Sequence, residues 1–240
     1  MNSFDEATLW ERLSQARQVP LEPAWLGEVY SPSLSVDLRH ALCERLGMLA
    51  ERGWPHLQRL LQQHGAQREL VLSAGLCHQP EARDWLLNQL KQADDFGIQT
   101  ALEALACWGA EVPCSVISDA LNHPSQQRRL AGLQLLTFHA YQLEDDELIQ
   151  LCDQPLQDFR DPVVIETIKV LQRRDGSVIT NRLAALIPNS SDAVARAALL
   201  ALGCIATPTS QRWLLELSQS LPEGERRQLA CKQLGQQFRP

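Results

Sequence analysis

The sequence has 240 residues, of which 45% are hydrophobic but only 5% aromatic, and it carries a formal net charge of −7. This acidic balance argues against a general nucleic-acid binder, because neutralising phosphates requires a basic surface. The low aromatic fraction and the lack of a linker or composition shift favour one continuous array of Leu- and Ala-rich helices over a β-rich core.

The first 34 residues do not share the pattern of the rest. Trp10 and Leu13 indicate a first helix, and the prolines around 21–33 indicate a bent segment or short helix. The N-terminus lacks the basic-then-apolar order of a signal peptide, and no apolar run reaches the length of a membrane span. We therefore expect residues 1–34 to cap an array in a cytoplasmic protein.

From residue 35 onward a leucine recurs with a period of about thirty residues, which is typical of a helix–turn–helix solenoid. These anchor leucines are Leu46, Leu76, Leu105, Leu135, Leu171, Leu202 and Leu234. Four residues earlier the side chain is small in most copies (Ala101, Ala131, Thr167, Ala198 and Ala230), which lets neighbouring helices approach closely. A short hairpin cannot bury its apolar face alone and stacks on its neighbours. The pattern predicts an all-α fold, an α-solenoid of about six helical hairpins over 35–235.

In chain order, the second helix of the first hairpin follows Trp54, and the second hairpin pairs 70–76 with 85–90. The third breaks at Gly109 before a helix near 116–121. The fourth contains an acidic excess, 139–162, which we expect to extend a loop; it is either a contact surface or a tolerated insertion. Although 163–170 is rich in β-branched residues, its place in the repeat predicts a helix.

The last copies carry the clearest signals for helix ends. An aspartate stands ten residues before three of the anchors, at Asp95, Asp161 and Asp192, and is predicted to be the N-cap of its helix. Gly203 and the Ala-Thr-Pro run at 206–208 predict the end of the helix that Asp192 begins. A final helix over 225–235 should cap the stack, and 236–240 should form a flexible tail.

The polar residues show no catalytic or metal-binding pattern. The seven cysteines lack paired metal-ligand spacing, and we expect Cys43, Cys107, Cys204 and Cys231 to be reduced, small core residues. The histidines show no ligand spacing either, so no metal and no cofactor are expected. The three pairs of adjacent arginines, at 128–129, 173–174 and 226–227, lie near helix ends and are read as solvated edges.

The candidate binding residues lie on the second helices, which we expect to line the inner face of the solenoid. They are Trp54, His56, Arg83, Trp85, Asp119, His123, Arg212 and Trp213. Tryptophans at such positions can be core between repeats. Exposed in a row with arginines, they would suit an anionic aromatic ligand or a protein partner.

Three segments resemble a known family. They are SDAVARAALLALGCIATPTSQRWLLEL at 191–217, DLRHALCERLG at 37–47 and DPVVIETIKVLQ at 161–172. Together they resemble HEAT-like repeats, more particularly the phycobilin-lyase HEAT-like group of cyanobacteria, over roughly 35–235.

The resemblance implies a protein that attaches or removes open-chain tetrapyrroles on phycobiliprotein cysteines, often with a second lyase subunit, or a chaperone for the same antenna proteins. A bilin would then be a substrate, and Arg83 and Arg212 would meet its propionates beside Trp85 and Trp213. The group has no short catalytic motif to carry over onto these positions, so whether the chain is an enzyme stays open.

Two alternatives from other classes remain. The first is a plain adaptor that binds a protein partner and no ligand. The second is a HEAT-like DNA glycosylase of the alkylpurine type, which requires a basic groove with aromatic and carboxylate residues; the acidic charge opposes it.

Overall fold

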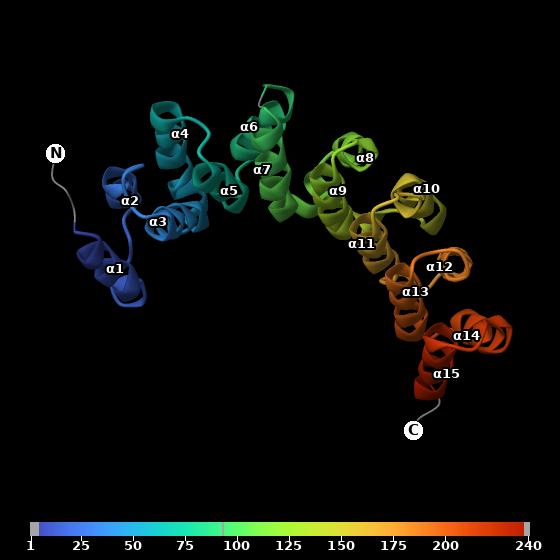
Figure 1. Ribbon diagram of the computed structural model, residues 1–240. Coiled ribbons are helices and arrows are strands. Elements are labelled where there is room, and N and C mark those ends of the chain that lie inside the picture. The colour runs from blue at the N-terminus through green and yellow to red at the C-terminus, as the bar shows by residue number, and fades with distance from the viewer. Residues whose placement is uncertain (1–4, 93, 238–240) are drawn as a thin grey trace. The chain divides into compact units, whose positions relative to one another are not determined.

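The computed structural model describes residues 5–92 and 94–237. It is helical throughout, with no strand among the residues it describes, and it confirms the predicted all-α, HEAT-like solenoid of stacked helical pairs. The chain divides into two compact units, residues 1–112 and 113–240, and each is described by itself. Figure 1 shows the helices in chain order.

Unit 1 packs α3, α5 and α7 side by side, with α4 and α6 against them. Its α-helices are α1 (Glu6–Ser14), α2 (Pro23–Val29), α3 (Val36–Met48), α4 (Trp54–His64), α5 (Arg68–Leu76), α6 (Pro80–Gln92) and α7 (Asp95–Leu105). Short 3-10 helices follow three of them: η1 (Gln15–Arg17), η2 (Ala50–Arg52) and η3 (Ala106–Glu111). Helix α2, in the predicted N-terminal cap, contacts α3 and α4.

Unit 2 consists of two rows of helices. The first row is α9 (Gln126–His139), α11 (Asp161–Leu171), α13 (Asp192–Ile205) and α15 (Glu225–Gln237). The second row is α8 (Cys114–Asn122), α10 (Asp145–Leu156), α12 (Ser177–Leu186) and α14 (Pro208–Ser220), with η4 (Ala140–Gln142) between α9 and α10. Each helix contacts its neighbours within its row and a partner in the other row. The last residues of the predicted tail, 238–240, lie outside the described residues.

The anchor leucines set the register of the stack as predicted, although Leu76 and Leu234 are only partly buried. Leu105, Leu135, Leu171 and Leu202 are completely buried, as are the small residues Ala101, Thr167, Ala198 and Ala230. Between α3 and α5 the approach is so close that a Cβ on Gly47 would lie 2.6 Å from the carbonyl oxygen of Ser73. The first helices of these two neighbouring repeats, α3 and α5, therefore pack with their backbones in close contact.

In unit 2 the first row, rather than the second, lies on the inner side of the curve (Figure 1). This corrects the expectation that second helices line the inner face. The physical reason lies in the small residues of the first row, at Ala131, Thr167, Ala198 and Ala230. Helices that approach closely along one row make that row the shorter side of the stack.

The predicted N-caps are wrong by one residue. Helix α13 begins at Asp192, but its cap is Ser191, whose Oγ accepts from the backbone N–H of Val194 at 3.3 Å. Asp94 caps α7 in the same way. An aspartate at the first helical position still interacts favourably with the helix dipole.

The acidic segment 139–162 does not extend a loop. Most of it forms η4 and the twelve-residue helix α10, which starts with a capping box between Glu144 and Glu147. The β-branched segment 163–170 lies in α11, as predicted. The fourth repeat is therefore a regular helical pair with a longer second half.

Only one of the four cysteines predicted to be core is buried. Cys43 is buried, whereas Cys107, Cys204 and Cys231 are exposed. Cys107 and Cys204 stand two residues after their anchor leucines, where the register turns side chains towards solvent. Cys231 lies on α15, the last helix of the described chain, so the side that a following helix would cover is open.

Each of the three arginine pairs contains a side chain that is tied to the rest of unit 2 rather than solvated, whereas Arg173 is exposed as predicted. Arg226 at the start of α15 donates to the carbonyl oxygens of Ile187 and Ser190, each at 2.8 Å, and pairs with Asp192 at 2.7 Å. Arg174 binds the carbonyls of Ala140 and Leu143 and pairs with Asp145. Each of these side chains ties a loop or helix start of one repeat to the corresponding part of the previous repeat, and guanidinium groups suit this because their donors are several and planar.

Candidate functional site

The candidate residues of unit 1 take part in local packing. Trp54 is buried at the start of α4, and His56 lies against Gly27 of α2. Arg83 on α6 pairs with Glu111 at 3.2 Å and lies over the ring of Trp108 at 5.7 Å from its centroid. Its charge is therefore already engaged within the unit.

The candidate residues of unit 2 lie at the two ends of the second row. Asp119 is on α8 and His123 follows it, whereas Arg212 and Trp213 are on α14, with α10 and α12 between them. The indole N–H of Trp213 donates to Asn181 at 2.7 Å. Arg212 is exposed. The structure does not bring these four side chains together, although each is placed on a second-row helix or at its end.

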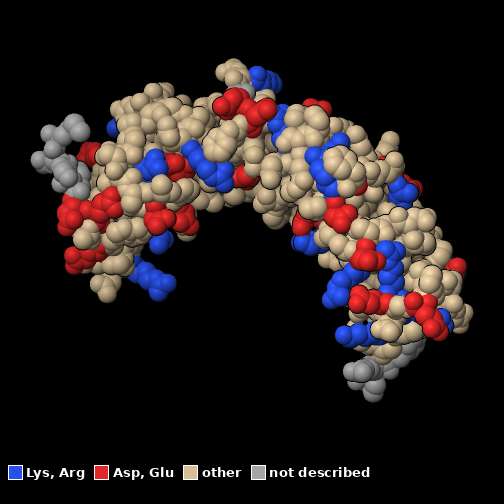
Figure 2. Space-filling view, viewed as in Figure 1, with Lys and Arg blue, Asp and Glu red and all other residues tan. Residues whose placement is uncertain are grey.

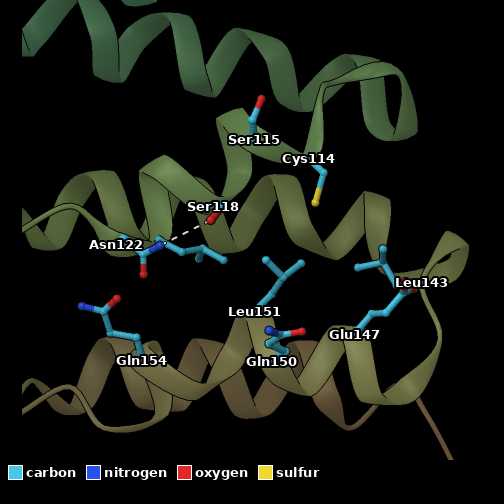
Figure 3. A pocket seen from close by; sticks show the side chains of 10 residues that line it. Cys114, Ser115, Ser118, Asn122, Leu143, Glu147, Gln150, Leu151 and Gln154 are labelled. Atoms are coloured by element: carbon cyan, nitrogen blue, oxygen red, sulfur yellow. Dashed lines mark hydrogen bonds between the residues drawn. The ribbon is translucent and has the colours of Figure 1, made fainter.

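A groove in unit 2 runs between α8 and α10 and has a volume of about 570 Å³ (Figure 3). Three leucines give it an apolar side: Leu121, Leu143 and Leu151. Polar side chains occupy the rest: Cys114, Ser115, Ser118, Asn122, Glu147, Gln150 and Gln154.

The groove offers hydrogen-bonding groups. Gln150 and Gln154 stand one turn apart on α10, and Figure 3 shows Gln154 opposite Asn122 of α8, which donates to Ser118 at 3.3 Å. Side-chain amides carry both donors and an acceptor, as a peptide backbone does. This groove could not be predicted from the sequence, because the residue pattern of one helix does not give its distance from a neighbouring helix.

Charge is divided between the two rows of unit 2. Helix α10 carries Asp145, Asp146, Glu147 and Asp153 and no basic residue. On the first row, Lys169, Arg196 and Lys232 are exposed. Figure 2 shows Lys and Arg atoms, with some carboxylates among them, along the inner edge over α11, α13 and α15. Although the chain as a whole is acidic, the first row of unit 2 thus carries solvent-accessible cations.

Two buried polar clusters also escaped sequence analysis. In unit 1, Glu69 accepts from the hydroxyl of Tyr30 at 2.9 Å and pairs with Arg39 at 2.8 Å, close to Cys43. Burial raises the pKa of the Cys43 thiol, and burial together with the Glu69 hydrogen bond raises that of Tyr30, so both stay protonated. In the sequence, Glu69 lies among the apolar residues of α5. Its role becomes clear only from its contacts with Tyr30 and Arg39, which come from other parts of unit 1.

In unit 2, Asp158 pairs with both Arg129 and Arg160 at 2.7 Å, and its side chain has no exposed surface. Hydrogen bonds from Arg160 hold the pKa of Asp158 below its usual range. This cluster fixes the connection between α10 and α11 and reaches back to α9. It is a structural tie, since both guanidinium groups share one carboxylate and also donate to the backbone carbonyls of His123 and Pro124.

Among the described residues, no group of His, Cys, Asp and Glu is arranged to hold a metal ion. No helix in the described part of the chain combines the length and apolarity needed to cross a bilayer.

No family model and no curated protein matches the sequence. Among solved structures, the complex of CpcE and CpcF of phycocyanin lyase from Nostoc sp. PCC7120 is similar, with a TM-score of 0.50 and 15% identity over 91% of this chain and 95% of that chain. Human deoxyhypusine hydroxylase gives a TM-score of 0.42 with 17% identity over 98% and 92% of the two chains. An engineered protein gives 0.47 with 15% identity over 95% and 70%. At such identities the likeness is one of fold.

Proposed function

We propose that this chain binds a phycobiliprotein subunit, with or without its bilin, and serves as a phycobilin lyase or a lyase-like chaperone. The observation that carries the proposal is the likeness to the CpcE–CpcF complex, which extends over nearly the whole of both chains. The repeat segments at 37–47, 161–172 and 191–217 agree with this fold, because they resemble HEAT-like repeats in sequence.

The described surfaces suit binding more readily than covalent chemistry. The groove between α8 and α10 presents amides and hydroxyls, and the first row presents free cations. An adaptor without a ligand would use the same surfaces, so the adaptor is the second candidate. The two candidates differ in whether a bilin becomes attached to the partner.

Co-expression with a bilin-producing pathway and a phycobiliprotein subunit tests the proposal. A lyase gives a subunit with visible absorbance that survives denaturation, because the chromophore is then covalently bound. A chaperone raises the yield of folded subunit without that absorbance. If the chain neither attaches a bilin to the subunit nor binds it, the proposal is contradicted. Binding without an attached bilin and without a gain in folded subunit favours the adaptor.

Within this function we propose two separate candidate contacts for bilin propionates, Arg83 beside Trp85 in unit 1 and Arg212 beside Trp213 in unit 2. Arg212 is the stronger candidate because it is exposed, whereas Arg83 already pairs with Glu111. Changing both to Ala should leave the chain folded, since exposed ion pairs contribute at most about 1 kcal/mol. It should reduce bilin transfer or partner binding by about tenfold or more for each charged hydrogen bond removed. Unchanged transfer and binding in the folded double variant would eliminate this assignment.

A further inference from the structure

Three side chains stand at the same level on neighbouring first-row helices of unit 2. Lys169 on α11, Leu200 on α13 and Lys232 on α15 each lie two residues before the anchor leucine of their helix. All three are exposed. Leu200 is an apolar residue with 37% of its surface exposed. Across the row the order is therefore cation, leucine, cation.

Arg196 adds a further cation one turn before Leu200 on α13. Neither Arg196 nor Lys232 has an ion-pair partner among the described residues, and both are exposed. Lys169 pairs with Glu166 on its own helix, an exposed contact that is worth little and is easily exchanged. We call Lys169, Arg196, Leu200 and Lys232 the first-row crest.

The surface beside the crest is hollowed. The groove between α13 and α15 is lined by Ala193, Leu199 and Leu229 together with four charged residues, Asp192, Arg196, Glu225 and Arg226. A second groove, between α9 and α11, is lined by four apolar residues, Leu130, Leu133, Pro162 and Val170, and by the polar residues Gln134, Thr137 and Glu166. The crest thus combines three cations with an apolar centre, and it lies beside grooves that are lined by both apolar and polar side chains.

The distances between the side chains of the crest determine which kind of ligand can contact all of them. Packed helices lie about 8–10 Å apart, so Lys169 and Lys232 flank Leu200 over about 20 Å. An extended chain advances about 3.3 Å per residue, so carboxylates about six residues apart would reach both lysines with an apolar side chain between them.

We propose that the first-row crest binds an acidic segment of a protein partner that carries an apolar residue between its carboxylates. A nucleic acid fits less well, because an exposed leucine, which a phosphate backbone would not contact favourably, stands at the centre of the crest. The inference rests on the proposed function only in that the chain binds a protein, and it specifies the chemistry of the segment that is bound.

The test uses the full chain and a fluorescein-labelled peptide of about 12 residues, with glutamates on both sides of a central leucine. The control peptides replace the glutamates by lysine or the leucine by serine. The crest variant is Lys169→Glu, Arg196→Glu and Lys232→Glu in one chain. Its matched control reverses the same number of exposed cations in unit 1, Arg45, Arg59 and Lys91, which also lack ion-pair partners among the described residues.

The acidic peptide should bind saturably and more weakly as salt rises, because exposed charges are screened. The crest variant should lose at least about tenfold in affinity, which is the loss of roughly one charge-assisted hydrogen bond, and the unit 1 control should not. Leu200→Asp should weaken binding, whereas Leu215→Asp on the second row, at 48% exposure, should not.

Absence of saturable binding to the unaltered chain overturns the proposal, as does an equal loss in the crest and control variants. Binding of single-stranded DNA of similar charge that is as tight as the peptide, and lost in the same variants, also overturns it. The assay contains neither bilin nor phycobiliprotein, so its failure is distinct from failure of the co-expression test.

Discussion

At the scale of single residues, pairing decides which charges are structural and which are free for binding. Arg174 and Arg226 are held by backbone carbonyls and carboxylates of the previous repeat, whereas Arg196 and Arg212 are exposed without such ties. All four look alike in the sequence. The difference lies in whether a carboxylate and a helix end from another repeat lie within reach.

Asp158 gives a pH-dependent prediction. Its folded-state pKa lies below the unfolded value of about 3.9, so its ionised form contributes stability that is present above that pH. The contribution is lost as the pH falls through the folded-state pKa. Asp158→Asn should therefore lower the free energy of unfolding by about 2 kcal/mol at pH 7, through the loss of charge-assisted hydrogen bonds.

Urea unfolding at neutral pH and at about pH 3 measures this difference, which should shrink at the lower pH. Asp175→Asn serves as the control, because Asp175 is exposed and has no partner among the described residues. A destabilisation of Asp158→Asn that is the same at both values would contradict the assignment of an ionised, paired Asp158.

At the scale of elements, close approach between first helices is the feature that organises each unit. Gly47→Ala would improve helix propensity by about 1 kcal/mol, yet its Cβ would meet the backbone of Ser73 at 2.6 Å. We expect a net destabilisation of about 1–3 kcal/mol from overpacking. Gly235→Ala on α15 is the control, because no atom lies within 4 Å of its Cβ and only the propensity gain remains. Equal stabilisation of both variants in thermal unfolding would show that α3 and α5 are further apart.

Much of this organisation could be predicted from the sequence, because the anchor leucines and small residues are local signals with a fixed register. The exposed positions of Cys107 and Cys204 follow from that same register, two residues past the anchor, but the apolar character of cysteine obscured it. The N-caps were misplaced by one residue because aspartate is favourable both at the cap and in the first turn. The groove between α8 and α10 and the inner position of the first row depend on how helices pack, which no single helix encodes.

Leu202 tests the cooperativity of the stack in unit 2. It is completely buried, so Leu202→Ala should cost about 2–5 kcal/mol through lost burial and a cavity. Because each repeat is stabilised by its neighbours, amide hydrogen exchange should also accelerate in α11 and α15. Leu215→Ala, at an exposed position of α14, should change stability by less than about 0.5 kcal/mol. An effect of Leu202→Ala as small as that of the control would mean that the anchor register is wrong.

At the scale of the whole molecule, the net charge of −7 conceals an uneven distribution. Unit 2 carries carboxylates on α10 and free cations on the first row. Such an arrangement gives a protein partner a preferred orientation, because complementary charges steer association and like charges oppose it. The proposed function and the first-row crest therefore make one joint claim, namely that a phycobiliprotein subunit binds and that the first row of unit 2 contributes to its binding.

Co-elution of an unpigmented phycobiliprotein subunit with this chain in size-exclusion chromatography tests that claim most directly. The subunit should co-elute with the unaltered chain and with the unit 1 charge-reversal control, and it should elute separately from the Lys169→Glu, Arg196→Glu and Lys232→Glu variant. Co-elution with all three chains would remove the first row as the binding surface. Separate elution from the unaltered chain would contradict the account of this protein as a phycobiliprotein-binding, lyase-like solenoid.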